Sequence, residues 1–407
     1  MPIVSHLFFD MNSYFASVAQ AEEPALLGKP VAVLTTDAPN AAVIAASLEA
    51  KRCGVGMGTR KGEARHLCPQ IVFRAVKHDV CTRYHHRIRA AAEQVLPISK
   101  AHSVDEFSCL LTGSQQDLKT ALAIGRQLQQ RLLRLNPALR CSVGLGPNRL
   151  LAKIAAELEK PLGLNWLLPE VLPARIAHLA LDDLPGISRA MRARLERSGV
   201  TTVPALYQLP LRQARAIWGS VEGERFLTAL RGGEVSETAT QHHSLGHGQV
   251  LTGSSRIPDQ ARLVARRLLV KAGSRLRREG YWARGLWLGV VCADKGRLSW
   301  GGQIMATQDT FFLLETLQRY WQRLNPRRPL RLHVYLTGLV PEAEHIPDLF
   351  ADPQSASRQQ LLRAVDGLNR RYGKDTVHFG LLAQHQVPYA GAKIAFGRIP
   401  DLDEFTE

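Results

Sequence analysis

Two hydrophobic patterns alternate along the first 165 residues: short apolar runs, and longer segments with apolar residues three or four positions apart. The apolar runs, which predict β-strands, lie at 3–9, 31–35, 101–111 and 140–145. The helical patterns lie at 14–22, 80–96, 118–136 and 148–159. Residues 40–76 are rich in Ala and Gly with scattered basic groups and indicate a small helical insertion. Strands and helices in this order predict an α/β unit.

The rest of the chain predicts three further segments. Short helices broken by Gly and Pro run from 166 to 238 and lead into a polar linker, Thr238-Ala-Thr-Gln-His-His-Ser. Strands and Arg-rich helices follow until about residue 340. The end, from Pro341, is at first acidic and then holds one helix at about 356–372. A chain of 407 residues is too long for a single core, so we expect several domains.

The composition indicates a soluble, cytoplasmic protein. No apolar run approaches the roughly 20 residues that span a bilayer, and the first residues lack the basic and apolar regions of a secretion signal. The six cysteines are widely spaced and include no Cys-x-x-Cys pair. This spacing argues against a zinc site and against disulfides, and it predicts buried, reduced thiols.

The charge balance points to a polyanionic partner. Lys and Arg number 52 against 36 Asp and Glu, which gives a net charge of +16. A nucleic acid fits such a surplus, because basic residues that neutralise phosphates release condensed counterions. An anionic membrane surface, or a charge that serves only solubility, remains an alternative on composition alone.

Three carboxylates lie where buried residues are expected. Asp10 directly follows the apolar run Leu7-Phe-Phe, and Asp105-Glu106 interrupts the predicted strand 101–111. Burying an unpaired carboxylate costs several kcal/mol, so such acids usually have a cation partner. Oxygen ligands of this kind suit Mg²⁺ or Mn²⁺, and two such ions can assist a phosphoryl displacement. Alternatively, Asp10 caps the next helix and Asp105-Glu106 pairs with nearby Arg or Lys.

The segments around these acids resemble the Y-family of translesion DNA polymerases. The matching segments occur in family order with family spacing over about the first 230 residues. They are Asp10-Met-Asn-Ser-Tyr-Phe-Ala-Ser-Val, Glu22–Val33, Glu49–Gly58, Ser103–Phe107, Ser142–Ala156, Lys160–Gly163 and Leu184–Ile187. The resemblance implies a multidomain α/β fold shaped as a right hand. Its parts would be a palm at 1–165 with fingers inserted at about 36–77, a helical thumb at 166–238, an α/β little finger at 239–340 and a tail at 341–407.

The resemblance also assigns roles to single residues. Asp10, Asp105 and Glu106 resemble the catalytic acids that bind two Mg²⁺ ions, for which Mn²⁺ can substitute, with the backbone carbonyl of Met11 as a further ligand. The implied nucleotide-binding residues are Tyr14, Phe15, Leu48, Lys51 and Lys160. Phe15 falls at the family's steric gate, where an aromatic ring excludes the ribose 2′-hydroxyl; without the motif it would be read as a helix core residue. Lys160 matches the lysine that contacts the triphosphate.

The predicted fingers depart from the family pattern. Leu48 and Lys51 stand where the family commonly has Tyr and Arg, and Ala45 where it has a hydroxyl residue. Leucine donates no hydrogen bond, and lysine lacks the planar fork of arginine. Nucleotide binding is therefore expected to be weaker or differently arranged.

Two basic segments predict DNA binding. Leu184-Pro-Gly-Ile-Ser resembles a helix-hairpin-helix, in which Gly186 permits a tight turn and the backbone at Ser188 meets a phosphate. The second segment has basic residues on one helical face with acids nearly absent, although a solvated helix face is the alternative. Its residues are Arg262, Arg266, Arg267, Lys271, Arg275, Arg277, Arg278 and Arg284, and we expect Arg327, Arg328 and Arg331 to extend the same surface.

Ile346-Pro-Asp-Leu-Phe resembles the peptide with which bacterial polymerases bind a sliding clamp, although it lacks the leading glutamine. Leu349 and Phe350 would be its apolar anchors. A loop that tucks both side chains into its own domain is an equal alternative.

The function implied is error-prone translesion DNA synthesis in DNA repair. A monomer associated with the nucleoid would add deoxynucleoside triphosphates to the 3′-hydroxyl of primer-template DNA, without contact to a membrane. The altered fingers leave open a second reading, a weakly active or inactive adaptor in a mutagenic complex. An unrelated basic nucleic-acid-binding protein would leave the ordered motifs unexplained.

Overall fold

The structure is a computed structural model that describes residues 3–36, 38–236, 243–346, 354–373, 376–380, 394 and 399–400, with the backbone alone at 354–356. The described residues form two compact units. Unit 1 holds those up to 236 together with Ile394, Ile399 and Pro400, and unit 2 holds those from 243 to 380. None of the described helices is long and apolar enough to cross a membrane.

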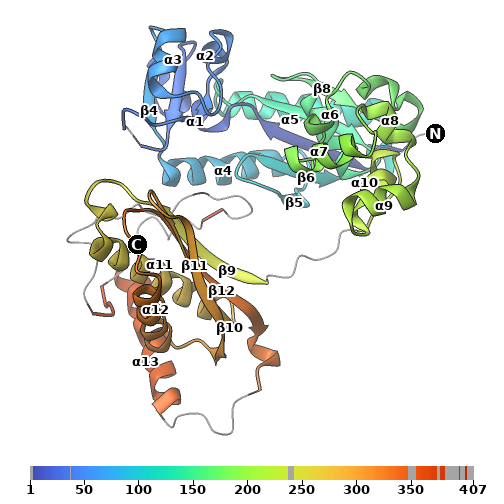
Figure 1. The fold of residues 1–407 in the computed structure, drawn as a ribbon. Helices are drawn as coiled ribbons and strands as arrows, with labels where there is room; N and C mark the ends of the chain where they lie inside the picture. Colours follow the sequence, from blue (N-terminus) through green and yellow to red (C-terminus); the bar gives the residue numbers. More distant parts are fainter. Residues whose placement is uncertain are drawn as a thin grey trace. The chain divides into compact units, whose positions relative to one another are not determined.

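Unit 1 is built on a five-stranded sheet with the order β5-β6-β1-β7-β8 (Figure 1). These strands are β1 (His6–Met11), β5 (Lys100–Ala101), β6 (Glu106–Leu110), β7 (Cys141–Gly146) and β8 (Leu164–Trp166). The central strand β1 runs antiparallel to both β6 and β7, so the residues that follow its apolar stretch lie between two neighbours.

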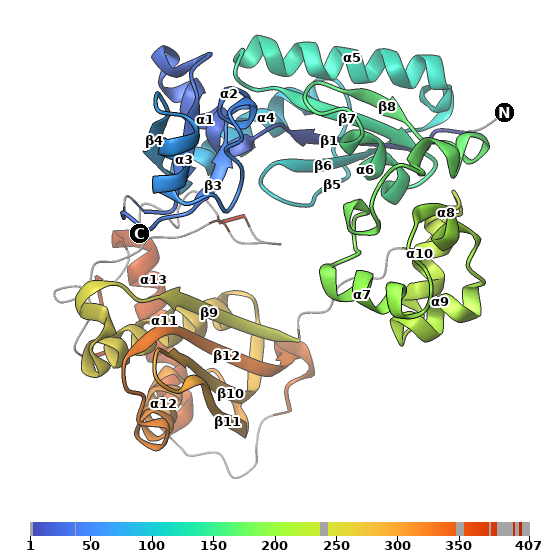
Figure 2. The same ribbon diagram turned by 45° about the horizontal axis from the view of Figure 1, so that its top comes forward.

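Helices cover both faces of this sheet, and Figure 2 shows α5 and α6 on opposite sides of it. On one face α4 (His78–Glu93) and α5 (Leu118–Leu135) enclose the main core, which contains Leu7, Phe9 and Met11. On the other face Phe8 packs against α6 (Arg149–Glu157). Because successive residues of a strand point to opposite faces, Asp10 lies on the same face as Phe8 and α6.

Helix α6 lies directly on the backbone of the sheet. An added Cβ at Gly144 of β7 would stand 2.0 Å from the carbonyl oxygen of Ala152 and 2.3 Å from the nitrogen of Ala156. Only glycine leaves room for a helix at this distance. The helix begins at Asn148, whose side chain accepts a hydrogen bond from the Leu151 N–H at 3.0 Å.

A second, three-stranded sheet in unit 1 has the order β3-β2-β4. Its elements are β2 (Val31–Leu34), β3 (Val43–Ala46) and β4 (Val72–Ala75), with α2 (Leu48–Arg52) and α3 (Lys61–Leu67) between them. The predicted small helical insertion over 40–76 contains the helices α2 and α3, but it also contains the strands β3 and β4, which the prediction missed. Its strands are only four residues long, and the surrounding Ala and Gly conceal them.

One further predicted strand is divided in the structure. The segment 101–111 is not one strand, because β5 ends at Ala101 and β6 begins at Glu106. Between them the Ser103 hydroxyl accepts hydrogen bonds from the N–H groups of Asp105 and Glu106, at 3.3 and 3.1 Å, and this forms a turn. The predicted helix at 14–22 is confirmed as α1 (Tyr14–Glu22).

The segment after β8 is helical, as predicted, and forms its own hydrophobic cluster with residues of α6. Its helices are α7 (Arg189–Arg197), α8 (Val203–Gln208), α9 (Leu211–Trp218) and α10 (Glu222–Leu230). Short 3₁₀ turns of the chain lie at Pro24–Leu26, Gly113–Gln116, Pro169–Val171, Ala174–Ile176, Leu181–Asp183, Gly253–Arg256 and Glu342–Glu344.

Unit 2 consists of an antiparallel four-stranded sheet with helices on one face. The sheet order is β11-β10-β12-β9. The elements are β9 (Ser244–Val250), α11 (Pro258–Arg278), β10 (Tyr281–Cys292), β11 (Gly296–Thr307), α12 (Thr310–Leu324), β12 (Pro329–Pro341) and α13 (Gln354–Tyr372). Helices α11 and α12 pack on the sheet with the core residues Leu286, Leu288 and Val290, so the opposite face carries the alternate residues. All six cysteines of the chain are free and five of them are buried, which confirms the predicted thiols.

Candidate active site and nucleic-acid interface

Strand register brings the predicted acids together. Asp10 of β1 lies directly opposite Glu106 of β6 and opposite Ser142 of β7. The Met11 N–H donates a hydrogen bond to the carbonyl of Asp105 at 3.0 Å, which fixes the turn that carries Asp105 against the end of β1. Asp10 and the distant pair Asp105-Glu106 thus converge at one end of the sheet.

Two lysines from the α6 side pair with these acids. The Lys160 ammonium lies 2.9 Å from Asp10 Oδ2 and 2.6 Å from Glu157 Oε1. The Lys153 ammonium lies 2.6 Å from Glu106 Oε1 and 5.3 Å from the centre of the Phe8 ring. Asp10 and Glu106 therefore form ion pairs with lysines of the same chain. For Glu106 this agrees with the alternative in which Asp105-Glu106 pairs with nearby Arg or Lys.

Burial makes Asp10 and Asp105 poor at holding a negative charge. It raises the pKa of Asp10 from 3.8 to about 7, against the attraction of Lys160, and repulsion from Asp105 adds to the rise. Burial also raises the pKa of Asp105, although the Ser103 hydroxyl donates a hydrogen bond to its Oδ1 at 2.5 Å. The pKa of Lys160 is raised in turn: burial opposes its charge, but Asp10 and Glu157 outweigh that effect.

Asn12 connects the end of β1 to the loop that carries Lys160. Its side-chain amide donates to Ser142 Oγ at 3.0 Å, and its Oδ1 accepts the Leu162 N–H at 3.0 Å. The same loop is fixed to α5 by Gln129, whose amide nitrogen donates to the carbonyls of Leu162 and Gly163 at 2.9 and 3.0 Å. Lys160 is therefore held in place beside Asp10 by hydrogen bonds from two elements.

The donor set fits a divalent cation. Asp10 is 8% exposed, and its pKa and that of Asp105 are raised, so a bound cation would relieve a charge that the fold penalises. The ligand atoms are carboxylate oxygens, which Mg²⁺ and Mn²⁺ prefer. As they stand, no three Asp, Glu, His or Cys side chains of the described residues are close enough together to hold a metal ion. Lys160 and Lys153 hold two of the three acids, so binding requires these carboxylates to change partner.

The first two residues of α1 differ in how deeply their side chains are buried. Tyr14 is 2% exposed, and its hydroxyl donates to the Cys81 carbonyl at 2.5 Å. Its side chain therefore belongs to the core, and the predicted contact of Tyr14 with a nucleotide stays a prediction. Phe15 is only partly buried, and its ring packs edge-on against Tyr14 and against His78, 6.5 Å between the Phe15 and His78 centroids.

The predicted fingers residues lie on the short helix α2. Ser47 caps this helix by accepting the Ala50 N–H at 3.3 Å. Partial burial and the repulsion of Lys160 lower the pKa of Lys51, whereas Asp10 attracts its ammonium group. Lys51 is therefore within electrostatic reach of the acids, and Leu48, at the start of the same helix, is half-buried.

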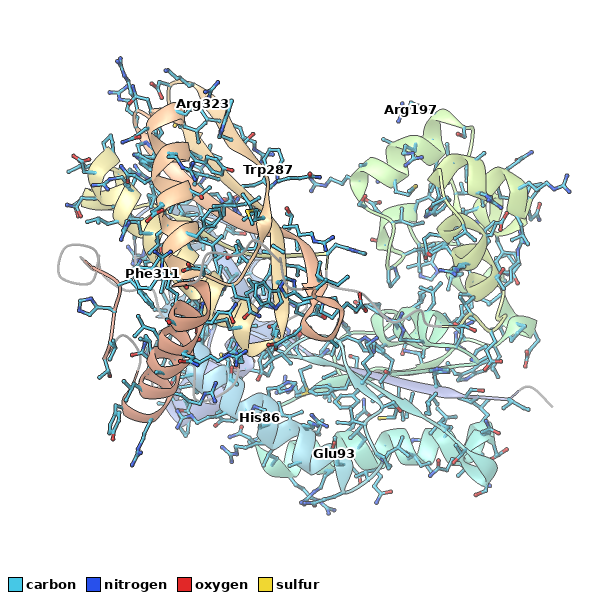
Figure 3. The ribbon with its side chains drawn as sticks, turned by 90° about the horizontal axis from the view of Figure 1, so that it is seen from below. His86, Glu93, Arg197, Trp287, Phe311 and Arg323 are labelled. Atoms are coloured by element: carbon cyan, nitrogen blue, oxygen red, sulfur yellow. The ribbon has the colours of Figure 1, made fainter. Side chains whose placement is uncertain are left out.

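Two glycine turns shape the helical segment after β8. Gly186 has φ +97°, and Ser188 then caps α7 by accepting the Met191 N–H at 3.3 Å. Gly219, with φ +70°, ends α9 ahead of α10. Both Gly186 and Ser188 are exposed, so the start of α7 lies at the surface of unit 1. Figure 3 labels Arg197 at the far end of α7.

More arginines of the basic helix α11 have an acidic or hydrogen-bonding partner than its sequence indicates. The Arg277 side chain is 6% exposed and forms two hydrogen bonds with Asp366 of α13, at 2.6 and 2.9 Å. Arg275 pairs with Glu279 at 2.7 Å, and Arg267 is buried with a hydrogen bond to Gln249 at 3.1 Å. The inference that this helix lacks opposing acids is wrong, because Asp366 comes from a helix some 90 residues further on.

Arg331 also lies elsewhere than expected. Its neighbours in β12, Leu332 and Val334, face α11 and the core, so Arg331 is exposed on the opposite face of the sheet. The predicted single surface of α11 arginines with Arg331 therefore does not form. Leu349 and Phe350 of the predicted clamp peptide lie outside the described residues.

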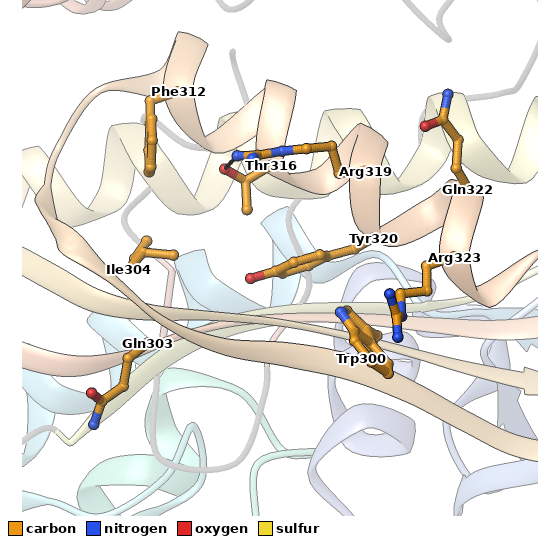
Figure 4. A pocket seen from close by; sticks show the side chains of 9 residues that line it. All are labelled: Trp300, Gln303, Ile304, Phe312, Thr316, Arg319, Tyr320, Gln322 and Arg323. Atoms are coloured by element: carbon orange, nitrogen blue, oxygen red, sulfur yellow. Dashed lines mark hydrogen bonds between the residues drawn. The ribbon is translucent and has the colours of Figure 1, made fainter.

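A hollow of about 790 Å³ opens between β11 and α12 in unit 2 (Figure 4). Its lining includes Trp300, Ile304 and Tyr320, with the Arg323 guanidinium 4.0 Å from the centre of a Trp300 ring. No acid lines it. It belongs to unit 2, whereas the paired carboxylates belong to unit 1.

Sequence reasoning missed four residues that organise the carboxylates: Asn12, Ser103, Lys153 and Glu157. Each lies inside a matching motif or one turn of helix away from it, so motif position could have marked them. Their partners could not be found in that way, because each contact depends on how β1, β6 and α6 are placed in three dimensions.

Comparison with known proteins places the chain in a family. Models of the impB/mucB/samB family and of its C-terminal domain match residues 9–157 and 242–349. DNA polymerase IV of Moorella thermoacetica is 32% identical over 412 residues, which covers 97% of this chain and 98% of that protein. DNA polymerase IV 1 of Bacillus subtilis is 27% identical and covers 93% and 94%.

The fold is similar to those of solved polymerases. The structure titled "Y-family DNA polymerase chimera Dbh-Dpo4(243-245)-Dbh" superposes with a TM-score of 0.67 at 20% identity, over 83% of this chain and 99% of that one. "Insertion ternary complex of Dbh DNA polymerase" gives a TM-score of 0.55 at the same identity. With its family models and its full-length relatives, the chain belongs to the impB/mucB/samB family of Y-family polymerases and is a DNA-directed DNA polymerase.

Proposed function

We propose that this polymerase carries out error-prone translesion synthesis with Asp10, Asp105 and Glu106 as its catalytic acids. The observation that supports this assignment is the register of β1 and β6, which sets Asp10 opposite Glu106 while the Asp105 turn binds the Met11 N–H. No other described acids combine this burial with the motif positions. Relatives named DNA polymerase IV that match nearly the whole chain support the polymerase activity.

The acids would hold two divalent ions, together with the Met11 carbonyl. Mg²⁺, or Mn²⁺ in its place, supplies the charge that lowers the pKa of the primer 3′-hydroxyl and stabilises the leaving pyrophosphate. Lys160 keeps its charge beside Asp10 and is 32% exposed, so its ammonium can turn to the triphosphate of a deoxynucleotide when Asp10 binds a cation.

The nucleotide pocket would be closed by Phe15 and α2. Phe15 is braced by Tyr14 and His78, which gives its ring the fixed position that a sugar gate requires. Lys51 adds a second positive charge, and Leu48 presents only an apolar surface to the base. A pocket with so few directional contacts tolerates damaged template bases at the cost of fidelity.

Primer-template DNA would be bound by backbone contacts that ignore sequence. The start of α7 lies at the surface after the Gly186 turn, so its backbone N–H groups at Ser188 would suit a phosphate. We assign residues 1–165 to the palm with its fingers, 166–238 to the thumb, 239–340 to the little finger and 341–407 to the tail. We also propose that the protein is a monomer and that Leu349 and Phe350 bind a sliding clamp.

Primer extension with Mg²⁺ and deoxynucleotides tests the assignment. Wild-type protein should extend a primer past a template lesion, and Asp105→Ala should lose on the order of a thousandfold in rate while it still binds primer-template DNA. Full activity of Asp105→Ala would refute the site. If wild-type protein binds DNA but does not extend it, the adaptor reading replaces the enzymatic one.

A further inference from the structure

The start of helix α4 lies beside Phe15, the residue proposed as the sugar gate. His78 is the first residue of this helix, and its ring packs edge-on against Phe15 with 6.5 Å between centroids and an interplanar angle of 81°. A second ring, that of Tyr14, also packs against Phe15, and its hydroxyl donates to the Cys81 carbonyl in the same helix. Both of these contacts depend on where the first turn of α4 lies.

This first turn begins without a side-chain cap. The residue before the helix, Lys77, forms no side-chain hydrogen bond to the N–H groups of α4. The first N–H groups of a helix have no partner within it, and a helix that lacks a cap is less stable at that end. His78 is only half-buried, and its neighbours Lys77 and Asp79 are exposed. A contact from elsewhere in the chain therefore decides how firmly the His78 ring is held.

The C-terminal tail supplies such a contact. The backbone N–H of Ile394, which lies 316 residues further along the chain, donates a hydrogen bond to Nδ1 of His78 at 3.3 Å. An N–H group donates only to a ring nitrogen that carries no proton, so in this arrangement the proton of the neutral imidazole is on Nε2. The same bond fixes the plane of the imidazole, and this is the ring that meets Phe15 edge-on.

Apolar packing holds the tail at this place. The side chains of Ile394 and Ile399 are half-buried and pack against the main core of unit 1, the core against which Phe15 also packs. Pro400 is buried. These three tail residues belong to unit 1, although the described residues from 243 to 380 form unit 2. The chain thus returns to unit 1 after it has formed unit 2, and it returns next to the gate.

We propose that the C-terminal tail is a specificity element of the polymerase, because Ile394 holds His78 against Phe15 and so keeps the sugar gate in position. The inference rests on the proposed role of Phe15 as that gate. A ring that excludes one hydroxyl group fails if it moves by about the width of that group, and small displacements at a reacting site change rates strongly. His78 acts through Phe15 and is a positioning residue.

The preference for deoxynucleotides over ribonucleotides in kcat/KM, measured with full-length protein, tests the proposal. Ile394→Asp places a charge against the core and should release the tail, whereas His78→Ala removes both the acceptor and the ring. Each should lower the preference by about three- to tenfold, mainly because ribonucleotides are incorporated better. The double variant should match the larger single effect, since both changes act on the same ring.

Two control variants separate this role from a loss of stability. Ile394→Val keeps the packing and the N–H donor and should keep the wild-type preference. Leu361→Asp makes the same apolar-to-acid change on α13, where the side chain is 50% exposed, and should also keep it. A variant that is merely destabilised would lose kcat/KM for both kinds of nucleotide alike, which leaves the ratio unchanged.

Amide hydrogen exchange checks the contact itself. The N–H groups in the first two turns of α4 should exchange faster in Ile394→Asp than in Leu361→Asp, and equal exchange would mean that the tail does not hold the helix. If Phe15→Ala lowers the sugar preference but His78→Ala and Ile394→Asp do not, the gate stands and this inference is wrong. If Phe15→Ala also leaves the preference unchanged, the gate assignment is wrong and the inference is wrong with it.

Discussion

The ammonium group of Lys160 lies 2.9 Å from the buried carboxylate of Asp10. Lys160→Met removes this partner and leaves the carboxylate without a compensating charge. We expect the free energy of unfolding in EDTA at about pH 8 to fall by about 2 kcal/mol, and the KM for deoxynucleotides to rise. Urea denaturation and steady-state kinetics measure these effects, and Lys160→Arg is the control that keeps the charge. Unchanged values for both quantities in Lys160→Met would contradict the pairing.

The pKa of Asp10 predicts how stability depends on pH without metal. Its folded value of about 7 exceeds the ordinary 3.8, so between these values the folded chain binds the extra proton. Stability therefore falls as the pH rises from about 4 to 7 and levels off above that, by up to about 4 kcal/mol. Thermal unfolding of the wild type and of Asp10→Asn in EDTA should show the difference between the two proteins shrinking toward low pH.

Divalent ions should act in the opposite direction. Ligand carboxylates must be deprotonated to bind a cation, so Mg²⁺ should raise the Tm more at about pH 8 than near pH 5. Asp10→Asn should lose most of this increase. An equal Mg²⁺ effect in both proteins would mean that the ion binds elsewhere.

Phe15→Ala should admit ribonucleotides. Removing the ring opens the space that a 2′-hydroxyl needs, and we expect the preference for deoxynucleotides over ribonucleotides in kcat/KM to fall at least about tenfold. Phe15→Tyr keeps the ring and should keep the preference. Unchanged sugar discrimination in Phe15→Ala would show that Phe15 is only a core residue of α1.

The altered fingers can be tested by restoring the family pattern. Lys51→Arg supplies a planar fork that can bind phosphate oxygens in pairs, so we expect the KM for deoxynucleotides to fall several-fold. Leu48→Tyr should add to this decrease through a hydroxyl donor. If neither variant lowers the KM, the triphosphate does not reach α2.

Arg277 is expected to stabilise unit 2 without binding DNA. Asp366→Leu leaves its buried guanidinium unpaired and should reduce the free energy of unfolding by about 3 kcal/mol, with DNA affinity unchanged below the transition. Arg363→Gln breaks the exposed pair with Glu342, where the side chains are 64% and 51% accessible, and should change stability little. If a folded Asp366→Leu protein loses DNA affinity, Arg277 takes part in DNA binding and this prediction is wrong.

Local pattern predicted most elements of unit 1 but not the pairing between them. The helical repeat at 14–22 and the cap at Asn148 are properties of neighbouring residues, so the sequence predicts α1 and α6 closely. The short strands β3 and β4 each pair with β2 on either side of it, and their four-residue runs carry too little periodicity to be seen.

The same distinction explains the functional residues. Motifs predict Asp10, Asp105 and Glu106 as the catalytic acids that we propose, because their spacing along the chain matches the family. The burial of Tyr14 and the Asp366 partner of Arg277 depend on packing between distant elements. A count of charges along α11 could not reveal which of its arginines have an acidic partner on another helix.

The contact between Gly144 and α6 has a consequence for how the site responds to change. At Gly144 no side chain lies between this helix and the strand. A substitution in the core therefore cannot be accommodated at this contact by a change of side-chain rotamer. The position of α6, and with it the backbone of Lys153, is therefore set by direct contact between the backbones of the helix and of β7. Even one methyl group at position 144 would therefore push α6, and Lys153 with it, away from the end of the sheet that carries the carboxylates.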